Sequence, residues 1–209
     1  MDTMLLIKDI LDQKPIGNSH TVKAWVRTFR SNRFIALSDG STIRTLQAVV
    51  DFEKFDEALL KRITTGAALA LTGELVNSLG KGQEVELLVE SIVVLGDSNP
   101  DEYPLQPKKH SLEFLREHAH LRIRTNTFGA VMRLRHSLAF AVHEYLNKNN
   151  FFCLHTPIIT GSDAEGAGEM FNVSVLDKKN PPLTEEGKVD YRQDFFAKET
   201  NLTVSGQLE

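Results

Sequence analysis

Apolar and polar side chains alternate in five short runs over the first part of the chain, and this pattern constrains the fold more than any other feature. The runs cover residues 20–29, 34–40, 43–50, 67–76 and 85–95. Alternation with a period of two is typical of half-buried strands. A helical pattern lies over residues 51–63, with Asp51 as its expected N-cap. We therefore expect three strands, one helix and two more strands.

This element order is that of an OB-fold, a small Greek-key barrel whose exposed face binds oligonucleotides. Cations and aromatic residues are interleaved along the first three runs: Lys23, Trp25, Arg27, Phe29, Arg30, Arg33, Phe34 and Arg44. Aromatic rings stack on unpaired bases, and cations follow phosphates. The alternative is that the aromatic residues belong to the core and the arginines form a solvated face. For Trp25 we favour the core; for Phe34 and the arginines both interpretations stay open.

The composition, with 41% hydrophobic and 25% charged residues, excludes fibrous and disordered classes. A net charge of −4 argues against a protein that coats nucleic acid without selectivity, although it leaves room for local basic patches. The single cysteine, Cys153, lies in an apolar run, so we expect a buried side chain rather than a catalytic thiol. No run approaches the ~20 apolar residues of a membrane span and no signal peptide is recognised, so we expect a cytoplasmic protein without membrane contact.

We expect three parts in the chain: a barrel over residues 1–98, a linker and hinge over 99–124, and a second domain over 125–209. The linker begins in a polar, proline-containing stretch without periodicity. Ser111 is the expected N-cap of a short helix. Three histidines of the hinge do not have the spacing of a closed metal site, and we expect no metal there: His110, His118 and His120.

The longest helical pattern covers residues 125–150, and it carries more apolar surface than a small neighbouring sheet needs. We therefore expect part of this helix to pack on another subunit. The apolar run 151–160 predicts a strand, with Pro157 at its edge or end because proline lacks an N–H group. Residues 165–169 place two carboxylates in a glycine-rich frame, which suits either a ligand ammonium or a solvated acidic turn. A further strand is expected over 202–207.

These motifs resemble class IIb aminoacyl-tRNA synthetases. The resemblance to their anticodon-binding OB-fold is carried by Trp25-Val26-Arg27, Phe34 to Gly40 and Leu46 to Val50. The next motifs are similar to the hinge and to class II motif 1, the helix and strand of the dimer interface: His120 to Thr125 and Phe151 to Thr160. Further segments look like the bacterial asparaginyl-tRNA synthetases rather than the aspartyl or lysyl enzymes: Ser162 to Phe171, Phe195 to Glu199 and Leu202 to Leu208.

The resemblance implies an all-β OB-fold barrel followed by an incomplete α+β catalytic domain, an antiparallel sheet with the motif 1 helix. It also implies roles for residues of the barrel. Phe34 would stack on the central uridine of the anticodon, Gln47 would hydrogen-bond to the edge of that base, and Arg27 would contact the backbone of the anticodon stem. Pro157 would lie in the interface of a homodimer.

In the second domain the resemblance implies an amino-acid site. Glu165 and Gln207 would hold the α-ammonium group, with Ser205 nearby. The full-length enzyme would use ATP and Mg²⁺ to convert L-asparagine to asparaginyl-adenylate and would then transfer it to tRNA(Asn). The arginine-bearing motifs 2 and 3 are not found in these 209 residues. We therefore expect no catalytic residue and no bound cofactor in this chain, and no asparagine activation by it alone.

Three alternatives remain. One is an aspartyl-tRNA synthetase, including one that does not discriminate between the two tRNAs. The segment 165–171 and the polar insertion at 172–194 favour the asparaginyl enzyme. The second is a non-catalytic tRNA-binding module. The third is a general single-strand-binding OB protein, against which the negative net charge and the long helix argue.

Overall fold

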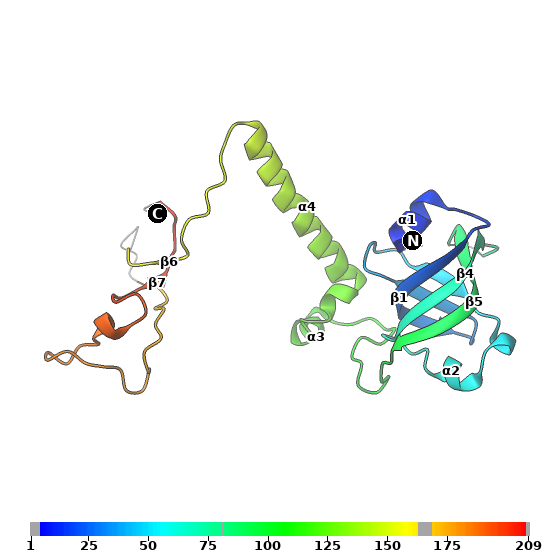
Figure 1. Cartoon of the computed structure of the whole chain (residues 1–209), viewed down its shortest axis with the longest axis horizontal. Helices are drawn as coiled ribbons and strands as arrows, with labels where there is room; N and C mark the ends of the chain where they lie inside the picture. The colour runs from blue at the N-terminus through cyan, green and yellow to red at the C-terminus, as the bar shows by residue number, and fades with distance from the viewer. Residues whose placement is uncertain (1–4, 81, 163–168, 208–209) are drawn as a thin grey trace. The chain divides into compact units, whose positions relative to one another are not determined.

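The structure is a computed structural model that describes residues 5–80, 82–162 and 169–207 (Figure 1). It divides into two compact units, residues 1–140 and 141–209. Among the described residues, no helix combines the length and the apolar character that crossing a membrane requires.

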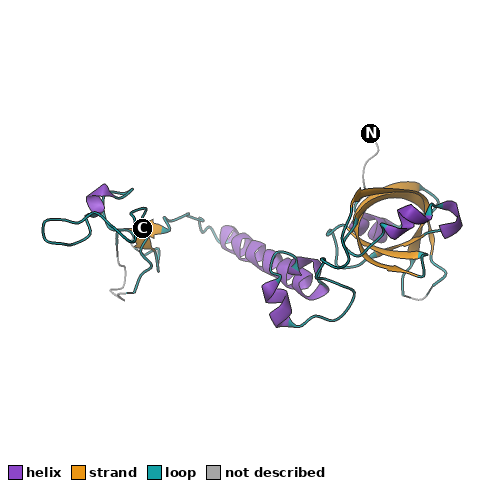
Figure 2. Ribbon diagram, turned by 90° about the horizontal axis from the view of Figure 1, so that it is seen from below, coloured by secondary structure: helices purple, strands orange, loops and turns teal. Residues whose placement is uncertain are grey.

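Five strands close into a barrel in the first unit, as the alternation predicts (Figure 2). They are β1 (Ser19–Arg30), β2 (Phe34–Ser38), β3 (Leu46–Val49), β4 (Ala68–Asn77) and β5 (Val85–Gly96). Their order around the barrel is β1-β2-β3-β5-β4, with β3 and β5 parallel and the other neighbours antiparallel. This is the predicted OB-fold, and its closure leaves no free sheet edge for association with other chains.

The inward positions of the strands fill the barrel with aliphatic side chains. Val22, Ala24 and Val26 alternate with exposed or half-buried residues along β1, and Ile35 and Leu37 are fully buried on β2. The helix α1 (Ile7–Gln13) contributes Ile7 and Ile10 to the same core. Apolar residues with a period of two therefore produce one continuous core.

The connection between β3 and β4 differs from the single helix predicted over residues 51–63. Two short helices replace it: η1 (Phe52–Lys54) and α2 (Glu57–Lys61). Phe55 between them is extended, with φ −124° and ψ 146°. The cap is also different, because the Asp56 side chain, and not that of Asp51, accepts a hydrogen bond from the Ala58 N–H at 3.2 Å. A side chain that caps in this way starts a new helix instead of continuing an existing one.

The hinge contains two helical segments, α3 (Leu112–Glu117) and η2 (Arg122–Arg124), and α4 (Asn126–Lys148) begins just after it. Ser111 caps α3 as predicted, since its hydroxyl accepts a hydrogen bond from the Phe114 N–H at 3.2 Å. The Thr125 hydroxyl accepts from the Phe128 N–H at 3.3 Å in the same way, at the predicted start of the long helix. Local hydrogen bonds therefore set where both helices begin.

The strand predicted over residues 151–160 is largely wrong. Residues 151–157, with Pro157, have no regular secondary structure, and only β6 (Ile159–Thr160) forms, paired with β7 (Asn201–Leu202). The strand predicted over 202–207 shrinks in the same way, because a strand needs a partner for its backbone groups. Cys153 is exposed, contrary to the expected burial, as are Phe152 and Leu154 beside it.

The polar insertion at residues 172–194 has one short helix, η3 (Tyr191–Gln193), and is otherwise largely irregular; local hydrogen bonds hold it. The Arg192 guanidinium donates to Asp190 at 2.7 and 3.0 Å, which lowers the pKa of that carboxyl to about 2. The Asp194 carboxylate accepts from the Val175 N–H at 3.0 Å. Because these carboxylates satisfy backbone and side-chain donors, the segment closes into turns without a sheet.

Candidate nucleic-acid interface

The outer face of β2 and β3 brings together an aromatic ring and an amide. Phe34 pairs with Val49, and Ala36 pairs with Gln47, in antiparallel register. The pleat points Phe34, Ala36 and Gln47 to the same outer side, while Ile35 and Leu37 face the core. Phe34 and Gln47 are therefore diagonal neighbours on one surface. Phe34 is half-buried, and the Arg33 guanidinium carbon lies 5.6 Å from the centroid of its ring.

The Gln47 amide is held by Glu86, a residue that sequence reasoning missed. β3 and β5 are parallel, and Gln47 is the register partner of Glu86. The Gln47 Nε2 donates to the Glu86 Oε1 at 3.0 Å, and the same oxygen accepts from Ser78 Oγ at 2.6 Å and Gln83 Nε2 at 2.7 Å. An ionised carboxylate only accepts hydrogen bonds, so the Gln47 Nε2 faces Glu86. The amide carbonyl oxygen is left for an external donor.

Replacing Glu86 by alanine releases the Gln47 amide, and we expect RNA binding to lose base selectivity more than affinity. A hydrogen bond to a charged group contributes about 1.5–3 kcal/mol, so the ordering of the amide changes substantially. Binding measured by fluorescence anisotropy should show discrimination among loop-centre bases falling about tenfold. Glu90→Ala on the same strand, an exposed carboxylate, is the matched control. Equal effects of both variants would show that only surface charge matters.

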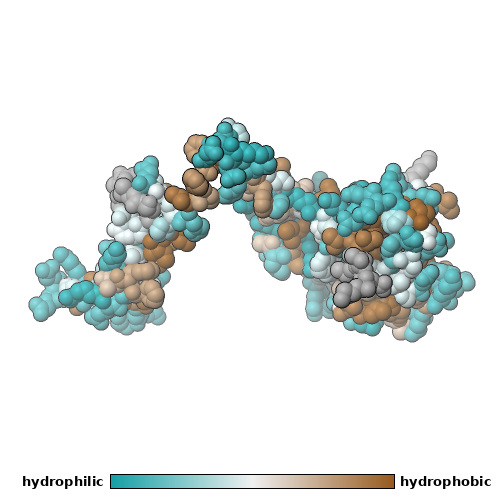
Figure 3. Space-filling model, turned by 45° about the horizontal axis from the view of Figure 1, so that its top comes forward, coloured by the Kyte–Doolittle hydropathy of each residue, from teal (hydrophilic) through white to brown (hydrophobic). Residues whose placement is uncertain are grey.

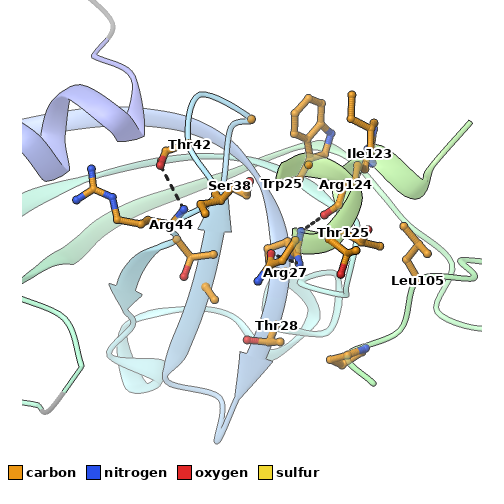
Figure 4. Close-up of a pocket in the computed structure, with 18 of the residues that line it drawn as sticks. Trp25, Arg27, Thr28, Ser38, Thr42, Arg44, Leu105, Ile123, Arg124 and Thr125 are labelled. Carbon is orange, nitrogen blue, oxygen red and sulfur yellow. Dashed lines mark hydrogen bonds between the residues drawn. The ribbon is translucent and has the colours of Figure 1, made fainter. Parts of the chain in front are cut away.

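Trp25 is exposed, so the core position favoured for it is wrong. Its side chain is on the outer face of β1, with 39% of its surface accessible. The Arg124 guanidinium carbon from the hinge lies 4.6 Å from the centroid of the indole ring (Figure 4). Such a cation–π contact favours the docked position of the hinge. Through this contact, Trp25 helps to hold the hinge next to the barrel.

Arg27 is also engaged with the hinge. Its guanidinium donates to the Arg124 carbonyl oxygen (Figure 4). It also donates to the Asn126 Oδ1 at 3.2 Å. These acceptors are 97 and 99 residues away in the sequence, which is why motif reasoning did not find them. The contact of Arg27 with an RNA backbone remains a prediction. In the structure, the Arg27 side chain forms hydrogen bonds within the chain instead.

A β-bulge in β1 explains how neighbouring residues of this strand can face both the hinge and the outer side of β2. Val26 pairs with Leu37 and Thr28 pairs with Ala36, so Arg27 is the extra residue. A bulge changes the phase of alternation and re-aims side chains. Val26 is buried and Phe29, three residues later, packs against the core. Arg27 and Thr28 can therefore both face outward, the first toward the hinge and the second toward β2.

The other predicted cations are on the barrel surface. Lys23, Arg30 and Arg33 are exposed on β1 and in the turn after it, and no salt bridge to them occurs among the described residues. Arg44 is exposed and paired with Asp12. Arg30, the register partner of Phe34, and Arg33 beside it therefore remain available for phosphates near Phe34, while Lys23 lies farther along β1.

The predicted amino-acid site is not assembled by the described residues. Glu165 lies outside them. Ser205 and Gln207 follow β7 in an irregular stretch, where the Gln207 N–H donates to Ser205 Oγ at 3.3 Å. The Ser205 N–H in turn donates to Thr203 Oγ1 at 3.3 Å. The ammonium-binding roles of these residues therefore stay predictions.

Two family models match the chain: an OB-fold nucleic acid binding domain over residues 20–95, and tRNA synthetases class II (D, K and N) over residues 111–198. The chain is 56% identical over 208 residues to the asparagine–tRNA ligase of Cytophaga hutchinsonii, and 53% over 207 residues to that of Thermosynechococcus vestitus. Each alignment covers 97% of this chain and 45% of the relative. Along nearly its whole length the chain is therefore similar to asparagine–tRNA ligases.

Two solved structures have the same fold as this chain. The asparaginyl-tRNA synthetase from Pyrococcus horikoshii complexed with asparaginyl-adenylate has a TM-score of 0.76 at 21% identity, over 99% of this chain and 44% of that one. A putative aspartyl-tRNA synthetase from Leishmania major has a TM-score of 0.71 at 17% identity, over 99% of this chain and 39% of that one. Both solved structures therefore share the fold of this chain over nearly its whole length. The chain spans less than half the length of the curated relatives it matches.

Proposed function

We propose that the whole protein is an asparagine–tRNA ligase that works in the cytoplasm. It would activate L-asparagine with ATP and transfer it to tRNA(Asn). The identity of 56% to an asparagine–tRNA ligase, maintained over nearly all of this chain, carries the proposal. The outer face of β2 and β3 supports it, since that face presents a ring for stacking beside an oriented amide.

The orientation of the Gln47 amide favours uridine as the base beside Phe34. Glu86 occupies the Gln47 Nε2, which leaves the carbonyl oxygen as an acceptor. Uridine offers an N3–H donor at its pairing edge, whereas the N3 of cytidine and the N1 of adenine are acceptors. A buried acceptor that faces another acceptor loses its hydrogen bond and stays desolvated. This agrees with the central uridine of the anticodon that the family resemblance implies.

ATP and Mg²⁺ are proposed for the whole protein only. The described residues contain no group of three or more His, Cys, Asp or Glu side chains placed to hold a metal ion. The residues of this chain proposed for the amino-acid site would bind and orient the ammonium group: Glu165, Ser205 and Gln207.

A homodimer through α4 and the stretch 151–160 is part of the proposal. No residue of α4 is buried in the single chain, and Leu134, Leu138 and Phe140 are each more than half exposed. Hydrophobic atoms, brown in Figure 3, reach the surface beside the end of this helix. Phe152 in the following stretch is 91% exposed. Apolar surface of this extent is typical of a protein–protein interface.

Aminoacylation by the full-length protein tests the proposal. We expect ATP-dependent attachment of asparagine to tRNA(Asn). Attachment of aspartate instead would favour the aspartyl alternative, and attachment of neither would favour a non-catalytic module. The 209-residue chain alone should show no asparagine-dependent exchange of pyrophosphate into ATP. Exchange by this chain would overturn the expectation that its residues are insufficient for activation.

A further inference from the structure

The start of the linker is fixed to the barrel just after β5. The Thr64 Oγ1 donates to the Ser98 carbonyl oxygen at 2.5 Å, and the Ser98 Oγ donates to the Thr65 carbonyl oxygen at 2.9 Å. Beside them, the Arg62 guanidinium donates to both carboxylate oxygens of Asp97, each at 2.8 Å. The loop between α2 and β4 therefore holds the first residues of the linker through hydrogen bonds from both sides.

Gly66 allows the ring of Tyr103 to pack on the same loop. Its φ of +91° lies in the left-handed region that favours glycine. A Cβ at this position would lie 3.0 Å from the Tyr103 Cε2 and Cζ and 2.8 Å from the Ser98 Oγ. The Gly66 N–H donates to the Val26 carbonyl oxygen of β1 at 2.8 Å. The Tyr103 ring is therefore in contact with fixed barrel backbone, and a side chain at position 66 would displace it.

The part of the linker that carries Tyr103 is closed by its own hydrogen bonds. The N–H groups of Glu102 and Tyr103 donate to the Asn99 carbonyl oxygen at 3.2 and 2.9 Å. The Gln106 Nε2 donates to the carbonyl oxygens of Tyr103 and Pro100 at 2.7 and 2.9 Å. Two prolines in this segment restrict its backbone further. A flexible tether would leave these backbone groups to solvent, so this segment is an ordered extension of the barrel.

The ordered segment continues into the hinge. The His110 Nε2 donates to the Gln106 carbonyl oxygen at 3.0 Å. The His110 ring stacks on Phe114 of α3, with 4.8 Å between the ring centroids. Leu105 and Leu115, on the two sides of this connection, are both buried. The position of Tyr103 on the barrel is therefore transmitted to the first helix of the hinge.

We propose that residues 97–106, which we call the bracket, fix the position of the hinge for aminoacylation, with Gly66 and Tyr103 as positioning residues. The inference rests on the proposed function. A tRNA ligase holds its RNA at the anticodon and reacts at the other end of the molecule, so both ends must be placed together. A misplacement of 1 Å far from the chemistry can cost about 100-fold in rate. The bracket would thus act on this coupling, and neither on base recognition nor on asparagine activation.

Tyr103→Ala in the full-length protein tests the bracket. We expect kcat/KM for the aminoacylation of tRNA(Asn) to fall ~10- to 100-fold, because the ring that holds the hinge is lost. Asparagine-dependent exchange of pyrophosphate into ATP should be unchanged. Binding of a linear RNA strand with uridine at its centre, which reports on the face of β2 and β3, should also be unchanged. Hydrogen exchange of residues 99–106 should become faster, since their hydrogen bonds lose the contact that anchors them.

Tyr103→Phe keeps the ring on Gly66, so it should restore both the aminoacylation rate and the slow hydrogen exchange. Phe52→Ala is the matched control, because Phe52 is an aromatic residue of η1 outside the bracket and is 53% exposed. This control should leave all four measurements unchanged. Normal aminoacylation by Tyr103→Ala would overturn the proposal, and so would a failure of Tyr103→Phe to restore it.

Gly66→Ala tests the same contact from the barrel side. The added Cβ displaces the Tyr103 ring, so we expect slower aminoacylation with unchanged pyrophosphate exchange. Binding of the linear strand is measured on the same sample. If this binding fell as much as aminoacylation in both the Gly66 and Tyr103 variants, the barrel would be damaged and the positioning role would be wrong. A wild-type protein that attaches no asparagine would contradict the proposed function instead, and rapid hydrogen exchange of residues 99–106 in it would still overturn the bracket.

Discussion

Replacing Phe34 by alanine weakens binding of a uridine-centred stem-loop RNA by about 1–3 kcal/mol, the usual contribution of one base stacked on an aromatic ring. Phe34 is half-buried on the outer face of β2, and the core beneath it is made by Ile35 and Leu37. The free energy of unfolding should therefore change little. Anisotropy titration measures the binding, and urea unfolding measures the stability.

Phe29 provides the comparison for this variant. It is an aromatic residue of β1 that packs against the core. Phe29→Ala should lower the free energy of unfolding by about 3–5 kcal/mol at most, because a partly buried ring loses fewer contacts than a fully buried one. If Phe34→Ala destabilised the fold as much as it weakened binding, Phe34 would belong to the core and the stacking role would be wrong.

Replacing Gly73 by alanine should destabilise the barrel by about 2–4 kcal/mol, the range for overpacking against a backbone that cannot move aside. A Cβ at this position would lie 1.9 Å from the Leu88 carbonyl oxygen and 2.7 Å from its carbon. The register between β4 and β5 shifts between Thr72 and Gly73, so the close approach belongs to an irregularity of the ladder. Urea unfolding followed by far-UV circular dichroism gives the change.

Gly96→Ala at the end of β5 is the control for Gly73. Its Cβ would meet Ala68 Cβ at 3.8 Å, an ordinary contact distance. We expect a change below ~1 kcal/mol there, since the residue gains no clash and loses some backbone freedom in the unfolded state. Similar midpoints for Gly73→Ala and wild type would mean that β4 and β5 can separate locally, against the tight pairing described above.

The barrel was predictable from the sequence because its signal is local. Val22, Ala24 and Val26 face inward with a period of two, and each strand repeats this pattern. The same phase placed Trp25 outward, yet the usual burial of tryptophan argued for the core. The alternation along the strand predicted the position of Trp25 better than its residue type did, because successive side chains of a pleated strand point to opposite faces whatever their size. The cap predicted at Asp51 was wrong because Asp56, five residues later, caps the helix α2 in its place.

The candidate interface was predictable only in part. Phe34 and Gln47 are neighbours through a simple hairpin register, which the sequence indicates. Glu86 reaches Gln47 through the parallel pairing of β3 with β5, and that pairing exists only after the barrel closes. The hinge contacts of Arg27 depend on tertiary structure in the same way. Contacts of this kind have no spacing in the sequence from which to infer them.

The stretch 151–160 shows the limit of an apolar pattern. Its residues have strand propensity, but most of them lack a partner strand among the described residues, and Phe152 and Cys153 are exposed. Propensity describes how well a side chain fits a pleated, half-covered surface. Without that surface the run does not form a strand, which agrees with the proposal that a second subunit covers it.

Exchange of the central loop base tests the central claim, that the barrel face reads a uridine through Phe34 and Gln47. The wild-type chain is titrated with stem-loop RNAs that differ only in this base. We expect cytidine or adenosine to bind about tenfold more weakly than uridine, or worse, because the Gln47 carbonyl oxygen then faces a ring nitrogen that is an acceptor instead of the uridine N3–H. Gln47→Ala should remove most of this preference. Equal affinity for all central bases in the wild-type chain would contradict the account.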